Sequence, residues 1–283
     1  MTASGMTPVV APGVVPVSIR SRDNPLLVRL RKLARDPGGY RKGGEVWLEG
    51  EHLCSALRAR GGRPLQAVLS ESAWQQSALR ELAAWAPRIA LLPDALFAQC
   101  SALGSPGQIG FVLALPAAPS IEPDRPAVVL DRVQDAGNVG SILRSASAFG
   151  VSQVLALQGT AALWSPKVLR AAMGAHFGLR LVEGLQAGDL DALALPWVGT
   201  SLHTDALLHA APLPWPCVWL FGHEGQGVDA ALLARCSQVV RIAQPGGEES
   251  LNVAAAAAIC LHETQRQNLL RSASSQAQLR SIR

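Results

Sequence analysis

The sequence predicts an α/β protein of two domains. Short apolar segments suited to β-strands alternate with amphipathic or alanine-rich segments suited to helices along the 283 residues. A stretch containing four prolines, residues 116–126, interrupts this alternation and has little that could pack in a core. We therefore expect the following division: a flexible tail at 1–17, a small α/β domain at 18–115, a linker at 116–125, a second α/β domain at 126–271 and a flexible tail at 272–283.

The N-terminal domain is expected to begin with a helix over residues 24–35. Its leucines fall on one stripe with the arginines opposite, and Asn24-Pro25 is a suitable helix start. Strands and helices then alternate to the end of this domain. Their expected order is strand 45–50, helix 52–61, strand 66–70, helix 72–86, strand 88–92, helix 93–103 and strand 110–115.

The C-terminal domain begins with a continuous apolar strand, residues 127–133, of the type buried in a parallel sheet. The expected elements that follow are a helix beginning near Gly140, strand 153–159, helix 165–175, strand 179–183, helix 189–195 and strands 197–202, 217–222 and 239–243. An alanine-rich helix, residues 250–270, comes last. The Ser/Gln-rich tail after it is expected to be disordered.

Composition limits the class of protein. Hydrophobic residues make up 49% of the chain, enough for a buried core, but no apolar stretch is long enough to cross a membrane. The cysteines are scattered and form no CxxC pair, which argues against a disulfide framework or a zinc site. We expect reduced core cysteines, no bound metal and a cytoplasmic location.

Positive charge is concentrated near the N-terminus. Between Arg20 and Lys42 lie eight basic residues and only two acidic ones. Such a cluster attracts phosphate backbones, yet a solvated helix face would have the same composition, and charge alone favours neither interpretation. The candidate RNA contacts are Arg20, Arg22, Arg29, Arg31, Lys32, Arg41 and Lys42.

Three loops at predicted strand ends are rich in Gly, Asn and Ser. The first, residues 131–150, contains Asn138, which is suited to start the following helix. Arg144 follows in a run of small and apolar residues, where a cation needs a partner. A structural salt bridge would satisfy Arg144, and so would a phosphate or ribose of RNA.

The second loop, residues 221–229, has three glycines that let its backbone approach a ligand closely. Glu224 lies at the mouth of a strand, where α/β folds bind ligands, although it could simply accept hydrogen bonds from nearby backbone. We assign no role to His223. In the third loop, residues 241–257, Ser250 and Asn252 are good helix-starting residues.

Together these loops resemble the three signature motifs of the SpoU (TrmH) branch of the SPOUT RNA methyltransferases. The family patterns are N-x-G-x-x-x-R, F-G-x-E-x-x-G and I-P-M-x-G-x-x-x-S-L-N-V, and this chain has NVGSILR, FGHEGQG and IAQPGGEESLNV. The first half resembles the family's L30e-like RNA-binding domain through SRDNPLLVRLRKL and VWLEGEHLCSAL. The chain departs from the family at Ala243-Gln244, where Pro-Met is usual, which affects packing around the cofactor.

The resemblance implies a homodimeric RNA 2'-O-ribose methyltransferase that uses S-adenosylmethionine and has a trefoil knot in its SPOUT domain. It places the catalytic group at Asn138, Arg144, Glu224, Ser250 and Asn252. It places the cofactor pocket at Thr200, Gly222, Ile242, Gln244 and Leu251. Arg144 would act across the dimer interface by gripping phosphate and polarising the hydroxyl, because a guanidinium is a poor base.

The expected substrate is 23S rRNA, because tRNA-specific relatives often lack the N-terminal domain. A tRNA 2'-O-methyltransferase and a non-catalytic RNA-binding protein of the same fold are the alternatives. The second would predict loss of Arg144, Glu224 or Asn252, and all three are present. A Rossmann-type nucleotide enzyme would require GxGxxG after the first strand, where this chain has DAGNVG.

Overall fold

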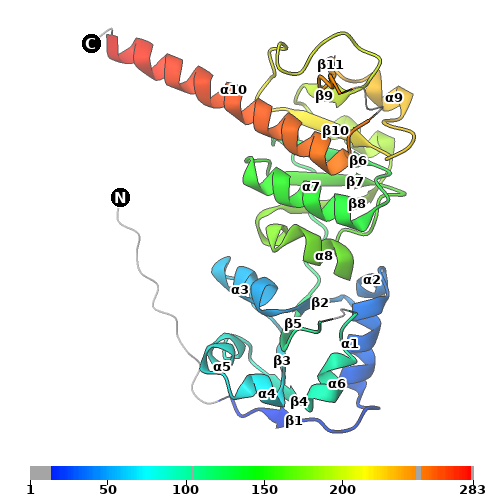
Figure 1. Cartoon of the computed structure of the whole chain (residues 1–283), viewed down its shortest axis with the longest axis vertical. Coiled ribbons are helices and arrows are strands. Elements are labelled where there is room, and N and C mark those ends of the chain that lie inside the picture. Colours follow the sequence, from blue (N-terminus) through cyan, green and yellow to red (C-terminus); the bar gives the residue numbers. More distant parts are fainter. Residues whose placement is uncertain (1–13, 103–104, 247–249, 282–283) are drawn as a thin grey trace. The chain divides into compact units, whose positions relative to one another are not determined.

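The computed structural model describes residues 14–102, 105–246 and 250–281 (Figure 1). The chain divides into two compact units: one is Met1–Pro116 with Trp164–Pro166, and the other is Ala117–Leu163 with Lys167–Arg283. The division after Pro116 falls at the start of the proline-rich segment. No helix in the described part of the chain is both long and apolar enough to span a membrane.

The first unit contains a mixed five-stranded sheet. Its strand order is β1 (Val17–Ser18), β4 (Ile89–Leu92), β3 (Gln66–Ser70), β5 (Ile109–Ala114) and β2 (Glu45–Glu49). The pairs β1–β4 and β4–β3 are parallel, whereas β3–β5 and β5–β2 are antiparallel. The helices of this unit are α1 (Pro25–Arg35), α2 (Gly39–Gly43), α3 (Glu51–Ala59), α4 (Glu71–Trp74), α5 (Ser77–Ala83) and α6 (Asp94–Ala98).

Helix α1 forms as its sequence pattern predicts. The side chain of Asn24 caps it by accepting a hydrogen bond from Leu26 N at 2.9 Å, and Pro25 occupies the first turn. The leucine stripe of this helix is buried. Because the leucines face the core, the charged residues of α1 lie mainly on its outer side.

Two predictions for the first unit are wrong in detail. The expected single helix over residues 72–86 is replaced by the two short helices α4 and α5. The helix is interrupted because Gln76 has an extended backbone and its side chain donates a hydrogen bond to Gln108. The expected flexible tail includes Val17, but this residue belongs to β1 and pairs with Ala90 of β4. Helix α2 is an additional element, which ends at Gly44 in the left-handed backbone region.

The second unit contains a six-stranded sheet in which every pair is parallel. Its order is β11 (Gln238–Val240), β9 (Trp197–Thr200), β10 (Val218–Gly222), β6 (Ala127–Asp131), β7 (Gln153–Leu157) and β8 (Arg180–Leu185). The helices are α7 (Ala136–Ala148), α8 (Pro166–Ala172), α9 (Ala230–Leu233), α10 (Val253–Ser281) and the 3-10 helices η1 (Ala175–Gly178) and η2 (Ala187–Ala192). The predicted α/β class is confirmed.

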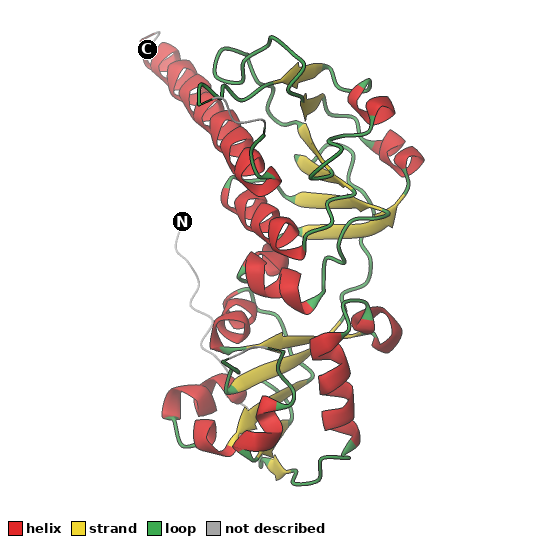
Figure 2. Cartoon of the chain, turned by 45° about the vertical axis from the view of Figure 1, so that its right-hand side comes forward, coloured by secondary structure: helices red, strands yellow, loops and turns green. Residues whose placement is uncertain are grey.

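Both faces of this sheet are covered. Helices α7 and α10 lie side by side over one face (Figures 1 and 2), where Trp219 of β10 donates a hydrogen bond to Thr264 of α10 at 3.1 Å. On the other face Leu220 packs in a cluster with Leu190 of η2 and Leu232 of α9. A sheet buried on both sides explains why its strands are continuous apolar runs.

Three boundaries in the second unit differ from prediction. Helix α7 begins at Ala136 because the Asp135 side chain accepts a hydrogen bond from Asn138 N at 2.8 Å, so Asn138 is not the capping residue. The expected helix at 189–195 is the shorter η2. Helix α10 continues to Ser281, although we expected disorder from Ser272; its Ala, Gln and Leu residues favour helix, and extending an existing helix costs little.

Candidate active site

The loops that carry the three motifs leave the parallel sheet at one edge. Gly222, the last residue of β10, pairs with Asp131, the last residue of β6. Thr200 at the end of β9 pairs with Val240 at the end of β11. Since β9 also pairs with β10, the carboxyl ends of four strands are neighbours. Parallel sheets of this kind bind ligands at that edge.

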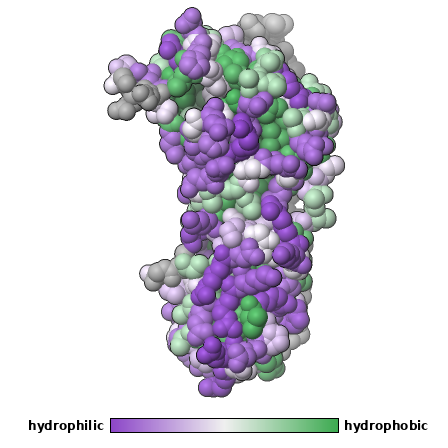
Figure 3. Space-filling model, turned by 90° about the vertical axis from the view of Figure 1, so that its right-hand side faces the viewer, coloured by the Kyte–Doolittle hydropathy of each residue, from purple (hydrophilic) through white to green (hydrophobic). Residues whose placement is uncertain are grey.

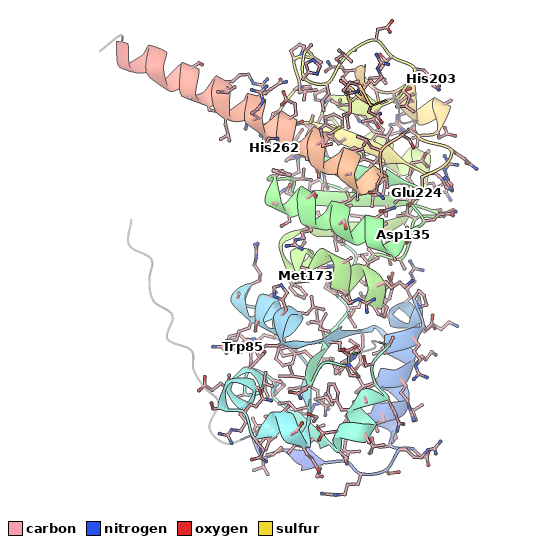
Figure 4. All side chains as sticks on the ribbon, viewed as in Figure 1. Trp85, Asp135, Met173, His203, Glu224 and His262 are labelled. Atoms are coloured by element: carbon pink, nitrogen blue, oxygen red, sulfur yellow. The ribbon has the colours of Figure 1, made fainter. Side chains whose placement is uncertain are left out.

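A chain of hydrogen bonds joins the three motif loops. Glu224 Oε1 accepts from Asp135 N and from Asn138 Nδ2, each at 3.1 Å, and its Oε2 accepts from Gln134 N at 3.2 Å. Asn138 Oδ1 in turn accepts from Asn252 Nδ2 at 2.8 Å. Figure 4 shows Glu224 and Asp135 close together at the start of α7. Glu224, Asn138 and Asn252, hereafter the Asn–Asn–Glu chain, are therefore brought together as predicted.

Helix α10 fixes one end of the Asn–Asn–Glu chain. Asn252 Oδ1 accepts hydrogen bonds from Ala254 N at 2.9 Å and from Ala255 N at 3.1 Å, so Asn252 caps this helix. Both amide groups are thereby held in one orientation. Each amide nitrogen carries two hydrogens, and contacts with described residues use one of them. The second hydrogen of each can be donated to a substrate oxygen.

Glu224 is ionised at neutral pH. Desolvation raises the pKa of this carboxyl, but hydrogen bonds from Asp135 N, the Asn138 side chain and Gln134 N outweigh it, so the pKa lies below its ordinary value. The simpler interpretation of Glu224, acceptance of backbone hydrogen bonds, is thus what the structure shows. This carboxylate holds the first and second loops together and orients Asn138.

An ion pair at the same edge was not expected from the sequence. Asp131 is 2% exposed and binds the neighbouring Arg132 through both oxygens, at 2.7 and 2.9 Å. Asp229 N also donates to Asp131, and Arg132 donates to Gln226 at 3.0 Å. Burial raises the pKa of Asp131, but the hydrogen bonds from Arg132 and Asp229 N lower it by more. The pKa therefore lies below its ordinary value, and this carboxyl is ionised at neutral pH. Arg132 has φ +57°, a left-handed conformation rare for a residue with a side chain.

Two predicted catalytic residues lie outside the Asn–Asn–Glu chain. Arg144 is exposed on α7, which corrects the expectation of an apolar site, and it makes no ion pair or hydrogen bond with any described residue. Six residues of helix place it about 9 Å along α7 from Asn138 and on a different side of the helix. Ser250 is exposed and has no hydrogen bond within the described ranges. Neither residue is joined to the site within one chain.

The five predicted cofactor residues lie at the ends of β9, β10 and β11 and before α10. Gln244 Oε1 is buried and accepts no hydrogen bond from a described residue. An unpartnered acceptor matches the amino and hydroxyl donors of S-adenosylmethionine, and partly buried Ile242 and exposed Leu251 add apolar surface. The residues present therefore fit this cofactor.

The reason for glycine at position 222 differs from the one we expected. A Cβ at Gly222 would lie 2.3 Å from the backbone atoms Gly227 C and Val228 N. The turn is closed by hydrogen bonds between His223 and Gly227 in both directions, and His223 Nδ1 accepts from Gly225 N. Glycine is thus required by close packing within its own loop. A larger residue would displace that loop and in this way weaken binding of a ligand at the site.

The five cysteines are all free, and four of them are buried. Burial raises the pKa of Cys217 to about 12 and that of Cys236 to about 11, so these thiols are unreactive at neutral pH. Among the described residues, no group of three or more His, Cys, Asp or Glu side chains is placed to hold a metal ion.

The predicted RNA contacts of the first unit differ in what they bind within the protein. Arg20 pairs with Glu71 at 3.1 Å, and Arg29 pairs with Glu45 at 3.2 Å. The other predicted contacts divide as follows: Arg22 pairs with Asp23, Arg31 donates to Arg22 O and Gln99, Arg41 lies over the Tyr40 ring, and Lys32 and Lys42 are exposed.

Comparison with known proteins finds a family model that matches much of the second unit and relatives that match most of the chain. The model of the SpoU rRNA Methylase family matches residues 125–262. An uncharacterized tRNA/rRNA methyltransferase of Synechocystis sp. is 32% identical over 267 residues, covering 88% of this chain and 94% of that protein. The 23S rRNA (guanosine(2553)-2'-O)-methyltransferase of Bacillus subtilis is 34% identical over 175 residues, 61% of this chain and 70% of that protein.

A solved structure resembles the fold over nearly the full chain. It is the SpoU methyltransferase AviRb from Streptomyces viridochromogenes in complex with the cofactor AdoMet. The TM-score is 0.78 at 25% identity, with 87% of this chain and 98% of that chain covered.

Proposed function

The chain belongs to the SpoU rRNA methylase family, and on that basis we propose that it methylates a ribose 2'-hydroxyl of RNA with S-adenosylmethionine. The Asn–Asn–Glu chain, which joins all three motif loops at one sheet edge, is the observation that carries this proposal. We propose 23S rRNA as the substrate, because the Bacillus subtilis relative is named as a 23S rRNA 2'-O-methyltransferase. With this substrate we also propose that the protein acts in the cytoplasm.

The residues of this chain act mainly by positioning. When bound, S-adenosylmethionine supplies an activated methyl group, and Gln244 with the backbone near Ile242 and Leu251 would hold it. The unused N–H groups of Asn138 and Asn252 can donate to oxygens of the target nucleotide, and Glu224 keeps Asn138 in place. Correct alignment of two reactants can contribute about 7–11 kcal/mol to catalysis.

Arg144 completes the proposed site from a second copy of the chain. Arg144 is exposed and lies on a different side of α7 from Asn138. It can therefore reach the site of a neighbouring molecule more readily than the Asn–Asn–Glu chain of its own molecule. Helix α10, beside α7, exposes Ile259 by 41% and Leu269 by 67%. Exposed apolar residues along the helix next to Arg144 support a homodimer formed through α7 and α10.

Mixed variants test this arrangement. If Arg144 acts across the interface, coexpressed Arg144→Ala and Asn138→Ala chains form heterodimers that contain one intact site. With random pairing the mixture should recover about a quarter of the wild-type activity, because half of the dimers are mixed and each has one of two sites intact. An inactive mixture whose chains are shown to pair would place Arg144 in the site of its own chain. Wild-type activity of Arg144→Ala alone would place Arg144 outside the mechanism.

The substrate is tested by mapping 2'-O-methyl groups. We expect a strain lacking this gene to lose one methyl group in 23S rRNA and none in tRNA. The purified protein should restore the same group when given the unmethylated rRNA and S-adenosylmethionine. Loss of a tRNA methyl group instead would select the tRNA alternative, and no loss with no transfer in vitro would favour a non-catalytic RNA-binding protein.

A further inference from the structure

The first unit contains a cavity of about 560 Å³ that lies between α1, α2 and the start of β2. This volume is within the range of about 300–1,000 Å³ that is typical of small-ligand sites. Its lining combines cations from two helices with an apolar surface: Arg29 and Lys32 come from α1, and Lys42 comes from α2. The cavity is therefore formed by several elements and differs from the charged face of a single solvated helix.

Some charged groups of this cavity form ion pairs within the protein and others do not. Arg29 is fixed by its ion pair with Glu45, whose side chain is 18% exposed. Glu45 Oε2 is buried and receives no hydrogen bond from a described residue, so the ion pair leaves its hydrogen-bonding capacity unfilled. Lys32 and Lys42 are exposed and form no ion pair with any described residue. Two ammonium groups are thus available for a phosphate. Glu45 would repel a phosphate, and so would Asp23, which also lines the cavity and pairs with Arg22 at 3.8 Å.

The lining of this cavity also contains apolar side chains, among them Val28 and Leu33. Val28 is 52% exposed, although it belongs to the same helix as the buried leucine stripe. Leu33 also lines the cavity but is only 6% exposed. Figure 3 shows a small hydrophobic patch ringed by hydrophilic residues on the face of the first unit that carries α1. A flat aromatic base could cover Val28, and burial of the exposed apolar surface would favour it.

We propose that this cavity binds one unstacked nucleotide of the RNA substrate. Its phosphate contacts Lys32 and Lys42, its base covers Val28, and the Glu45 carboxylate accepts an N–H of the base. RNA-binding proteins commonly recognise bases that are turned out of the helix in this way. The identity of the ligand rests on the proposed function, whereas the site itself rests on the cavity and its charges.

The test is titration of the full chain with 5'-GMP, followed by NMR of the amides of Gly39, Gly43 and Glu45. GMP should shift these signals saturably, whereas inorganic phosphate and guanosine should each bind at least about tenfold more weakly, since each makes only part of the contacts. The Lys32→Ala/Lys42→Ala variant should lose at least about tenfold in GMP affinity. Both lysines are exposed, so the variant is expected to fold.

The matched control removes two exposed charges outside the cavity, in Arg35→Ala/Arg60→Ala, and should bind GMP as the wild type does. Absence of saturable shifts, equal shifts with inorganic phosphate, or equal losses in both double variants would overturn the proposal. Methyl transfer is measured separately. The lysine variant should raise KM for rRNA and leave kcat unchanged. Failure to bind GMP with intact methyl transfer removes this site only, whereas GMP binding without any methyl transfer removes the proposed function only.

Discussion

Glu224→Gln is the most informative single substitution in the candidate site. The carboxylate accepts three hydrogen bonds, from Asp135 N, Asn138 Nδ2 and Gln134 N. Glutamine has one acceptor oxygen, and its amide nitrogen can only donate. The best orientation keeps the oxygen near Asp135 N and Asn138, so the new NH₂ group faces the Gln134 N–H and one hydrogen bond is lost.

The expected effect follows from these three bonds. Loss of one bond costs about 1 kcal/mol, and the other two weaken because they no longer involve a charge. Because Glu224 is exposed, screening by solvent limits the sum to about 1–2 kcal/mol. For a domain of this size we expect Tm to fall by about 2–8 °C. Methyl transfer should slow at least about tenfold, since Asn138 loses the partner that orients it.

The assay combines thermal unfolding with single-turnover methyl transfer at saturating S-adenosylmethionine. Asn138→Ala and the double variant complete a thermodynamic cycle. If Glu224 acts through Asn138, the double variant should be no slower than the worse single variant. Additive rate losses, or a Glu224→Gln enzyme with unchanged rate and Tm, would refute the positioning role.

Three further predictions concern Arg144, Gly222 and the carboxylates at the sheet edge. Arg144→Lys keeps the charge but not the planar fork, so Tm should stay constant while single-turnover transfer slows at least about tenfold, or ~1.4 kcal/mol; a near-normal rate would remove Arg144 from the mechanism. Gly222→Ala should lower cofactor affinity by calorimetry and also Tm, because its Cβ meets the backbone of Gly227; lost affinity at constant Tm would mean direct ligand contact. Glu224 and Asp131 have lowered pKa values, so their stabilisation is complete above about pH 4.5 and is lost as pH falls through the lower folded values. Tm should therefore decline less steeply with acid in Asp131→Asn than in wild type, and an unchanged acid limb would contradict this assignment.

Much of the fold followed from local pattern. The continuous apolar run of β6 predicted a strand buried on both faces, and the leucine stripe of α1 predicted an amphipathic helix; tertiary packing agrees with both. The meeting of the three motif loops was also predictable, because parallel strands direct their carboxyl ends to one edge. Asn138, Glu224 and Asn252 are joined there, and it was the resemblance to the family's motifs that implied this grouping.

Features set by contacts distant in sequence were not predictable. The break between α4 and α5 depends on Gln108, which is 32 residues from Gln76. The contact between Arg132 and Gln226 joins residues 94 positions apart, and nothing in the local pattern marks it. Helix α10 was expected to end too early because its Ser/Gln-rich part lacks an apolar stripe. The trefoil knot and the L30e-like character of the first unit stay predictions.

The polarity of the Asn–Asn–Glu chain limits the chemistry that it can perform. Hydrogen bonds run from Asn252 to Asn138 and from Asn138 to Glu224, so the terminal carboxylate already accepts three N–H groups. A carboxyl whose pKa is lowered in this way is a weak acceptor for the proton of a ribose hydroxyl. The two amides, by contrast, each have an N–H to donate. Donors held in place stabilise negative charge as it develops on an oxygen. Under the proposed function, the two amides would hold and polarise the 2'-oxygen, and the proton is expected to leave to RNA phosphate or water rather than to Glu224.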